Sequence, residues 1–188
     1  VSIKIKNKPI LHHIMDHYAK FGFKEFYIAL GYKGNVIKKY FQKQNLKSWN
    51  INLVETGKDT MTGGRLKRVA NYLGGEQSFC FTYGDGLSDV NISELLDFHR
   101  QHGKLATVTA ITPPGRYGAI LSEGSSVTGF QEKPPRDGAL INGGFFVLDL
   151  KTIDLIEDDQ TIWEAGPINK LATSGQLEAF RHNGFWQA

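Results

Sequence analysis

One short stretch, residues 78–86, restricts the possible folds of this chain more than any other. A run of apolar and aromatic residues ends there in Gly84-Asp85-Gly86. Such a run predicts a buried central strand, and the glycines predict a tight turn at its end. Open α/β sheets bind ligands at the carboxyl ends of their strands. Asp85 is therefore either the acidic residue of a β-turn or a ligand for a hydrated Mg²⁺.

Strands and helices are predicted to alternate along the rest of the chain. Apolar runs predict strands at 25–30, 49–55, 78–83, 105–111, 145–148 and 177–180. Helical spacing predicts helices at 8–21, 35–41, 62–73, 89–102, 151–157 and 162–173. A hairpin is predicted from 119–121 and 127–132. This order indicates an α/β fold with a mostly parallel, mixed sheet and helices on both faces.

Composition indicates a single globular domain over residues 1–188. The chain is 40% hydrophobic and 22% charged, with a net charge of +3. This charge suits a pocket for anionic ligands and is too small to indicate nucleic acid as a partner. No apolar run is long enough to span a membrane. The one cysteine, Cys80, excludes an internal disulfide and suits a reducing compartment such as the cytoplasm.

A second polar stretch follows the strand predicted at 49–55. Hydroxyls, glycines and cations occur together there: Thr60, Thr62, Gly63, Gly64, Arg65, Lys67 and Arg68. Free N–H groups at the start of a helix, with cations beside them, form a natural anion site. The alternative is a plain helix cap, with Thr62 as the capping residue and the glycines as a loose linker.

A third group of polar residues lies around 113–144. Residues 113–118, with Tyr117 and Gly118, predict a rigid loop. Glu132-Lys133 precedes two prolines, so that Lys133 could meet a phosphate and Glu132 a sugar hydroxyl. An ordinary surface lysine is the alternative. Asn142-Gly143 leads into the apolar strand at 145–148.

Five of the six histidines lie on two of the predicted helices. His13 and His17 are four residues apart, which is ligand spacing, but apart from Asp16 no acidic or cysteine residue is near in the sequence. We therefore expect His12, His13 and His17 to be packing or surface residues. His99 and His102 are expected on the exposed face of their helix.

Five ordered motifs together resemble the sugar-1-phosphate nucleotidylyltransferase family, and within it the cytidylyl branch. The resemblance covers nearly the whole chain, and the motifs are MTGGRLKR at 61–68, FTYGDG at 81–86, FQEKP at 130–134, INGGFF at 141–146 and GFWQ at 184–187. It implies a Rossmann-like three-layer domain of the nucleotide-diphospho-sugar transferase type. The implied reaction joins CTP and glucose 1-phosphate to give CDP-glucose and pyrophosphate with Mg²⁺, in a homo-oligomer that supplies dideoxysugars for the O-antigen of bacterial lipopolysaccharide.

The resemblance also implies roles for particular residues. Asp85 would bind Mg²⁺ and would, with Lys133, serve catalysis. The nucleotide would contact Thr60, Thr62, Gly63, Gly64, Arg65 and Gly84. The sugar phosphate would contact Tyr117, Gly118, Glu132, Lys133, Asn142 and Gly143.

The chain also departs from this family. The family's Gly-Gly-x-Gly-Thr-Arg phosphate loop is not in the sequence, and neither is the second metal-binding Asp that follows the Trp-Gln motif. The segment at 42–48 is shorter than the loop that the family has at that place. We therefore expect that sequence is missing at both ends, and that these 188 residues alone catalyse the reaction poorly.

Three alternatives remain open from the sequence. The chain could use another nucleotide or sugar, such as UTP or a mannose phosphate. It could be a metal-dependent glycosyltransferase that uses the Gly-Asp-Gly segment. It could also be a binding module that kept the fold without the catalysis.

Overall fold

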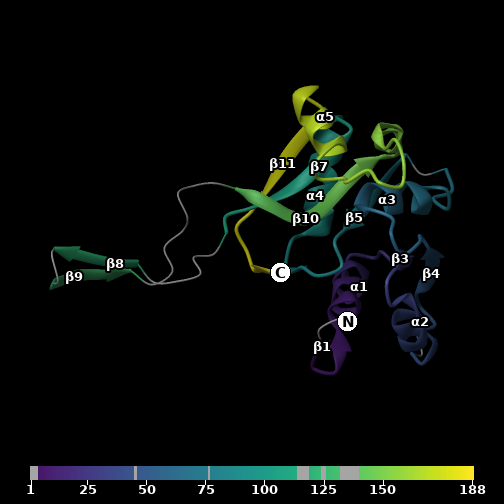
Figure 1. Cartoon of the computed structure of the whole chain (residues 1–188), viewed down its shortest axis with the longest axis horizontal. Coiled ribbons are helices and arrows are strands. Elements are labelled where there is room, and N and C mark those ends of the chain that lie inside the picture. The colour runs from purple at the N-terminus through teal and green to yellow at the C-terminus, as the bar shows by residue number, and fades with distance from the viewer. Residues whose placement is uncertain (1–3, 45, 76, 114–118, 124–125, 132–139) are drawn as a thin grey trace.

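The β structure of this protein forms two main parts in the computed structural model, which describes residues 4–44, 46–75, 77–113, 119–123, 126–131 and 140–188 (Figure 1). Strands β3 (Glu25–Leu30) and β4 (Asn50–Glu55) form a parallel pair. The larger sheet has the order β11-β7-β10-β5, with bounds Leu177–His182, Ala106–Ile111, Ile141–Asp149 and Ser78–Thr82. The sheet is mixed as expected, but β10 runs antiparallel to both of its neighbours.

The direction of β10 decides where its first residues lie. Phe145 stands opposite Thr82, so the residues before Phe145 extend past the carboxyl end of β5. The backbone N–H of Tyr83 accordingly donates to the carbonyl of Gly144, with an N···O distance of 3.0 Å. The beginning of β10 and the Gly-Asp-Gly turn after β5 therefore meet at one edge of the sheet.

Helices cover both faces of the larger sheet, and β10 is buried between them. Phe145 and Val147 pack with α1 (Ile10–Lys20) and α4 (Ile92–His102). Phe146 and Leu148 pack with α3 (Thr62–Ala70) and α5 (Pro167–Thr173). All four β10 side chains are at most 1% exposed. A strand buried on both faces needs apolar residues at successive positions, which explains the Phe-Phe-Val-Leu run.

A third core cluster lies around β3. Leu30 is fully buried there and packs with Met15 of α1 and Phe41 of α2 (Gly34–Gln42). The short elements are β1 (Lys4–Ile5), β2 (Lys8–Pro9), β6 (Leu87–Ser88) and β12 (Trp186–Gln187). The expected hairpin forms from β8 (Ala119–Glu123) and β9 (Ser126–Gln131).

Two predicted helices differ from those in the structure. The segment at 151–157 is a 3₁₀-helix, η1 (Leu150–Leu155), which begins where the Asp149 side chain accepts from the N–H of Lys151. The helix predicted from residue 162 begins only at Pro167. Proline has no N–H to donate and favours the first position of a helix, and residues 163–166 before it form turns instead.

The histidines pack more deeply than the sequence suggested. His99 is only 6% exposed, which corrects the expectation that it lies on an exposed helix face. Its Nδ1 and the Nε2 of His102 both hydrogen bond the buried hydroxyl of Thr107, at 2.8 and 2.7 Å. His13 and His17 donate from Nε2 to the carbonyls of Ile5 and Val90 and so hold α1 in place.

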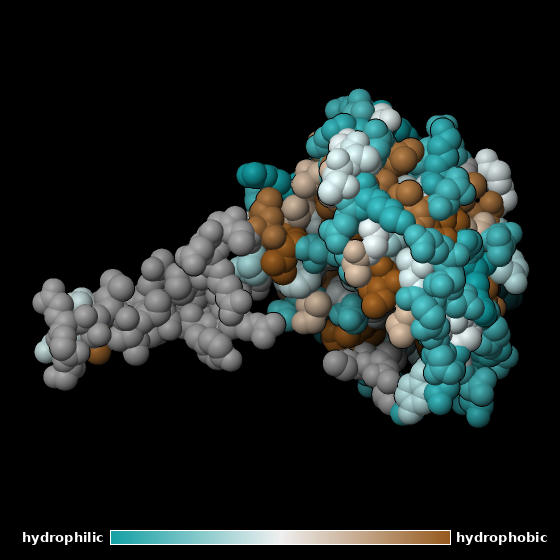
Figure 2. Space-filling view, turned by 45° about the horizontal axis from the view of Figure 1, so that its top comes forward, coloured by the Kyte–Doolittle hydropathy of each residue, from teal (hydrophilic) through white to brown (hydrophobic). Residues whose placement is uncertain are grey.

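The surface and the single thiol complete the description of the fold. The face in Figure 2 is mostly hydrophilic, with hydrophobic residues gathered in separate patches. No helix in the described part of the chain is both long enough and apolar enough to cross a membrane. Cys80 packs against the core on the α1 side, and burial raises the pKa of its thiol to about 12.

Candidate functional site

A cavity of about 220 Å³ opens where β5 ends and β10 begins. Asp85 is exposed at this cavity, in the turn that follows β5. Asn142 and Gly143 reach the same cavity from β10, so the structure brings together residues that are 57 positions apart in the chain. The cavity is lined by Tyr83, Asp85, Gly86, Asn142, Gly143, Gly144, Phe145, Trp186 and Ala188.

Two glycines allow β10 to bulge at this edge. The pairing of β10 with β7 shifts register between Asn142 and Phe146. Gly144 has a φ of +76° and lies under the ring of Tyr83, so a Cβ there would approach Tyr83 Cδ2 to 2.9 Å. A Cβ on Gly143 would come within 2.6 Å of the Ile111 side chain. Close packing therefore favours glycine at both positions, and the backbone conformation favours it at Gly144 as well.

Trp186 closes the cavity from the other side. Its strand, β12, pairs with β6, which directly follows the Gly-Asp-Gly turn. The indole Nε1 donates to the carbonyl of Gly143 at 2.8 Å. Sequence reasoning noted the motif that contains Trp186 but did not select this residue or Tyr83 as part of the site. Aromatic residues beside glycine-rich turns were the available signal for both.

The cavity suits a magnesium ion that keeps part of its hydration shell. Mg²⁺ is usually held by one or two carboxylates together with waters and substrate phosphates. Asp85 offers one exposed carboxylate with open space beside it. No group of three or more His, Cys, Asp or Glu side chains among the described residues is arranged to hold a metal. One carboxylate fits an ion whose other ligands are waters and phosphate oxygens.

The start of α3 is covered by another segment of the chain. The N–H groups of Met61 and Gly63 donate to the carbonyls of Asp159 and Thr161, at 2.8 and 2.9 Å. A Cβ on Gly64 would lie 2.6 Å from Asp159 Cα and from its carbonyl oxygen. The glycines therefore let the backbone of α3 approach this segment closely. They are not the loose linker of the capping alternative, and part of the expected anion site is used internally.

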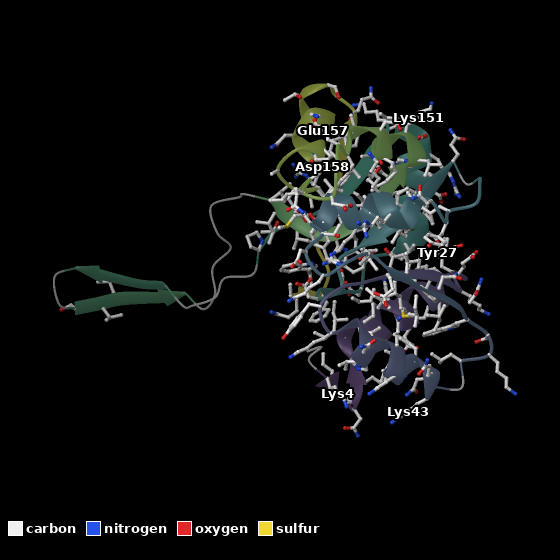
Figure 3. All side chains as sticks on the ribbon, turned by 45° about the vertical axis from the view of Figure 1, so that its right-hand side comes forward. Lys4, Tyr27, Lys43, Lys151, Glu157 and Asp158 are labelled. Carbon is white, nitrogen blue, oxygen red and sulfur yellow. The ribbon has the colours of Figure 1, made fainter. Side chains whose placement is uncertain are left out.

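Two of the three cations in this stretch are also used internally. Arg68 forms an ion pair with Asp159, in which Nη2 and Oδ2 are 2.5 Å apart. Lys67 donates to the carbonyls of Ile156 and Glu157. Figure 3 shows Glu157 and Asp158, from this covering segment, at the end of the molecule away from Lys4 and Lys43.

Arg65 differs from these two cations because its acceptors are all neutral. Its guanidinium donates to Thr56 Oγ1 at 2.7 Å and to the carbonyls of Lys58 and Leu30, at 3.1 and 3.4 Å. Leu30 ends β3 and Thr56 follows β4. Arg65 therefore brings a positive charge to the carboxyl ends of two parallel strands without a carboxylate partner in the described part of the chain. Such a charge attracts phosphate.

The hydroxyls of this stretch occupy different environments. Thr60 is buried, at 8% exposure, and follows a turn in which Gly57 has a φ of +87°. Thr62 is exposed; its Oγ1 donates to Glu164 Oε2 at 2.7 Å and accepts from the N–H of Trp163. Gly84 is exposed beside Asp85. Tyr117, Gly118, Glu132 and Lys133 lie outside the described residues.

A second hollow, an apolar groove of about 360 Å³, lies on the α5 side of the same sheet edge. Asn142 borders both hollows, and Glu164 is the carboxylate of the groove. The remaining lining residues are Val108, Ala110, Leu140, Ile141, Ile168 and Ala179. Two hollows thus meet at Asn142, one with Asp85 and the other with Glu164.

Known proteins match this chain along nearly its whole length. Residues 2–187 match the family described as Nucleotidyl transferase. Glucose-1-phosphate cytidylyltransferase of Salmonella typhi is 49% identical over 206 residues, which cover 98% of this chain and 80% of that protein. A probable glucose-1-phosphate cytidylyltransferase of Bacillus subtilis is 40% identical at the same coverage. The mannose-1-phosphate guanyltransferase of Saccharomyces cerevisiae is 30% identical, but only 53% of it is covered.

Solved structures with the same fold include nucleotide complexes. HddC from Yersinia pseudotuberculosis, complexed with GMP-PN, has a TM-score of 0.75 at 20% identity, covering 99% of this chain and 82% of its own. UDP-glucose pyrophosphorylase complexed with UDP-glucose has a TM-score of 0.68 at 16% identity, covering 98% of this chain and 82% of its own. At these identities the likeness concerns the fold.

Proposed function

Because this chain belongs to the nucleotidyl transferase family, we propose that it transfers a cytidylyl group from CTP to glucose 1-phosphate. The products are CDP-glucose and pyrophosphate. The observation that carries this function is the 49% identity to a glucose-1-phosphate cytidylyltransferase over 98% of the chain. The cavity that joins Asp85 to Asn142 and Gly143 is consistent with it.

The reaction needs charge stabilisation more than proton transfer. An oxygen of the sugar phosphate attacks the α-phosphorus of CTP, and the bond from that phosphorus to the pyrophosphate oxygen breaks. The attacking oxygen is already anionic at neutral pH, so no general base is required. The barrier comes from bringing two polyanions together, and positioned cations lower it. When bound, Mg²⁺ supplies such a charge on the phosphates.

The residues of this chain divide into two groups in the proposed complex. Asp85 holds Mg²⁺, and the exposed Gly84 leaves room for the nucleotide beside it. Arg65 attracts the nucleotide phosphates, which its unneutralised charge supports. Thr60, Thr62, Gly63 and Gly64 shape the same side, and the latter two act through their packing against residues 159–161.

The second group binds the sugar phosphate. Asn142 and Gly143 are supported in this role by their position in the cavity of Asp85. Lys133 is proposed to neutralise the sugar phosphate during transfer. Glu132, Tyr117 and Gly118 are proposed to contact the sugar.

The wider setting follows from the proposed substrates. We propose one nucleotidyltransferase domain over residues 1–188, acting in the cytoplasm, where CTP is made, and assembled as a homo-oligomer. Its product would supply the reactions that make dideoxysugars for the O-antigen of bacterial lipopolysaccharide. Size-exclusion chromatography with light scattering tests the assembly, and a monomeric mass would contradict it.

A substrate panel tests the function. The full-length protein is incubated with each nucleoside triphosphate and with glucose 1-phosphate or mannose 1-phosphate, and pyrophosphate release is measured with and without Mg²⁺. We expect Mg²⁺-dependent release with CTP and glucose 1-phosphate. Preference for UTP or GTP would refute the cytidylyl assignment, and release of free CDP would indicate a different reaction class.

Asp85→Asn tests the proposed metal ligand. Removing a group that stabilises transition-state charge costs about 100-fold or more in turnover. We expect that loss with an unchanged circular dichroism spectrum, because Asp85 is exposed. Asp97→Asn is the control, since Asp97 is an exposed α4 residue that pairs with Arg100. Full Mg²⁺-dependent activity of Asp85→Asn would refute the assignment of Asp85 as the metal ligand.

A further inference from the structure

Residues 183–187 form a strap that runs from the end of β11 to the cavity of Asp85. Trp186 and Gln187 of the strap pair antiparallel with β6, over only two residues. So short a pairing holds weakly by itself, because even a longer isolated two-stranded ribbon is only marginally stable in water. The position of Trp186 therefore depends on what else holds the strap.

The carbonyl of Phe185 is the point at which the strap is held most closely. It accepts from the hydroxyl of Ser88 at 2.9 Å and from the N–H of Asp89 at 3.1 Å. The Nε2 of His182 lies 3.2 Å from the same oxygen and 2.9 Å from Asp89 Oδ1. Both of these neighbours accept hydrogen bonds, so Nε2 carries the proton and donates. His182 and Asp89 thus form a clasp across the base of the strap.

Gly184 lies between the two groups of the clasp. A Cβ on this residue would overlap Asp89 Oδ1 and would lie 2.7 Å from His182 Cε1. Its φ is not positive, so an alanine at this position would not strain the backbone. The side chain of Asp89 is 62% exposed and is free to move, whereas that of His182 is only 11% exposed. A methyl group on residue 184 would therefore push the carboxylate away from the imidazole without removing either group.

The Asp89 side of the clasp is the fixed side. Val90 directly follows Asp89 and is fully buried in the core. His17 of α1 donates from Nε2 to the Val90 carbonyl at 2.8 Å. In the strap, by contrast, Phe185 is 58% exposed and Trp186 is only partly buried. Loss of the clasp should therefore loosen the strap and leave the segment around Val90 in place.

Trp186 connects the strap to the side chain of Asn142. Its Nε1 donates to the carbonyl of Gly143 at 2.8 Å. The N–H of the same peptide unit belongs to Gly144 and donates to Asn142 Oδ1 at 2.8 Å. The carbonyl and the N–H of a planar trans peptide point in opposite directions, so the indole and the amide hold this peptide from its two sides. The orientation of the Asn142 amide therefore depends on where the strap places Trp186.

We propose that His182 and Asp89 are positioning residues, which clasp the strap so that Trp186 keeps Asn142 oriented for the sugar phosphate. This inference rests on the proposed function, in which Asn142 binds that phosphate. Neither His182 nor Asp89 lines the cavity, so both act through the strap. Loosening the clasp should weaken the binding of glucose 1-phosphate more than the binding of CTP.

Hydrogen exchange of the full-length protein, followed by mass spectrometry, tests the clasp without any substrate. His182→Ala removes one group of the clasp, and Gly184→Ala separates the two groups. Both variants should exchange about three- to tenfold faster at 183–187, the effect of one hydrogen bond, while exchange around Val90 stays slow. Gly74→Ala is the matched control, because no atom lies within 4 Å of the position of its Cβ, and it should leave exchange in the strap unchanged.

Steady-state kinetics of the same variants test the positioning role. His182→Ala and Gly184→Ala should raise the KM for glucose 1-phosphate about three- to tenfold, and the KM for CTP should stay within about twofold. His182→Gln, whose amide can place a donor near the position of Nε2, should recover most of the loss. Adding Asp89→Ala to His182→Ala should raise the KM no further, because the effects of residues in contact do not add.

The two measurements separate this inference from the proposed function. Wild-type protein that makes no CDP-glucose would defeat the function, and the exchange measurement would still decide on the clasp. Unchanged exchange in the strap would overturn the clasp itself. Faster exchange with both KM values unchanged, with equal rises in both, or with effects that multiply in the double variant would overturn the positioning role, because the clasp would then be structural only.

Discussion

Gly64→Ala tests why two glycines stand in the first turn of α3. In the structure the Gly64 Cα faces the backbone of Asp159, and an added methyl would lie 2.6 Å from Asp159 Cα and its carbonyl oxygen. Backbone atoms cannot rotate away as a side chain can. The two segments would have to separate, which would strain the hydrogen bonds from Met61 and Gly63 to Asp159 and Thr161.

The size of the effect follows from two opposed terms. Overpacking a close contact costs about 1–3 kcal/mol. Alanine in place of glycine within a helix returns about 0.5–1 kcal/mol. The free energy of unfolding should therefore fall by up to about 2.5 kcal/mol, which lowers the melting temperature by up to about 10 °C for a chain of this size.

Urea denaturation followed by circular dichroism measures this change. Gly74→Ala is the matched control, since no atom lies within 4 Å of the position of its Cβ and it does not have a positive φ. That variant should be neutral or stabilised by up to about 1 kcal/mol. Binding of CTP to both variants is measured alongside.

The refuting result is specific. If Gly64→Ala kept wild-type stability and lost only its affinity for CTP, the glycine would serve the approach of a phosphate, and the packing argument would be wrong.

Three further predictions follow from the same structure. Gly144→Ala should lower the melting temperature more than Gly175→Ala. The two glycines have similar φ angles, +76° for Gly144 and +68° for Gly175, but only a methyl group on residue 144 would meet the Tyr83 ring. Equal losses would contradict that contact. Trp186→Phe, which removes the donor to the Gly143 carbonyl, should cost about 1 kcal/mol in transition-state stabilisation; unchanged kcat/KM would exclude a role in holding Gly143. Burial lowers the pKa of His99 and His102 below the ordinary value of 6.5, so the folded state favours their neutral forms. The free energy of unfolding should be retained above pH 6.5 and fall as the pH drops from there through the folded-state pKa values; urea titrations at about pH 7.5 and about pH 5 check this, and a flat profile would contradict it.

Much of the fold could be predicted because it depends on local patterns. The run at 78–83 forms the strand β5 as predicted, but the expectation of a buried central strand was wrong, because β5 lies at the edge of the larger sheet and its residues are half-buried. Helical spacing located α1 through α4 to within a few residues. The turn at Gly84-Asp85-Gly86 follows from the abrupt end of the apolar run. These features need no knowledge of distant segments.

The roles of individual residues depended on what packs against them. Gly63, Gly64, Lys67 and Arg68 have the composition of an anion site, yet the segment at 156–161 uses their N–H groups, space and charges. His99 lies on a helix face that the sequence suggested was exposed, but Thr107 of β7 covers it. A sequence pattern indicates which polar groups are present. It does not indicate whether another segment of the same chain binds them.

The sequence by itself determined the α/β class, the order of the elements and a carboxylate at the exit of β5. Only the tertiary structure decided that β10 runs antiparallel to β5, which places Asn142 and Gly143 beside Asp85 and puts Trp186 across the cavity. The physical reason is that strand periodicity specifies which faces are buried, and this is the same for either strand direction. The direction depends on pairing and packing between distant segments. It therefore also decides which residues lie together in the site.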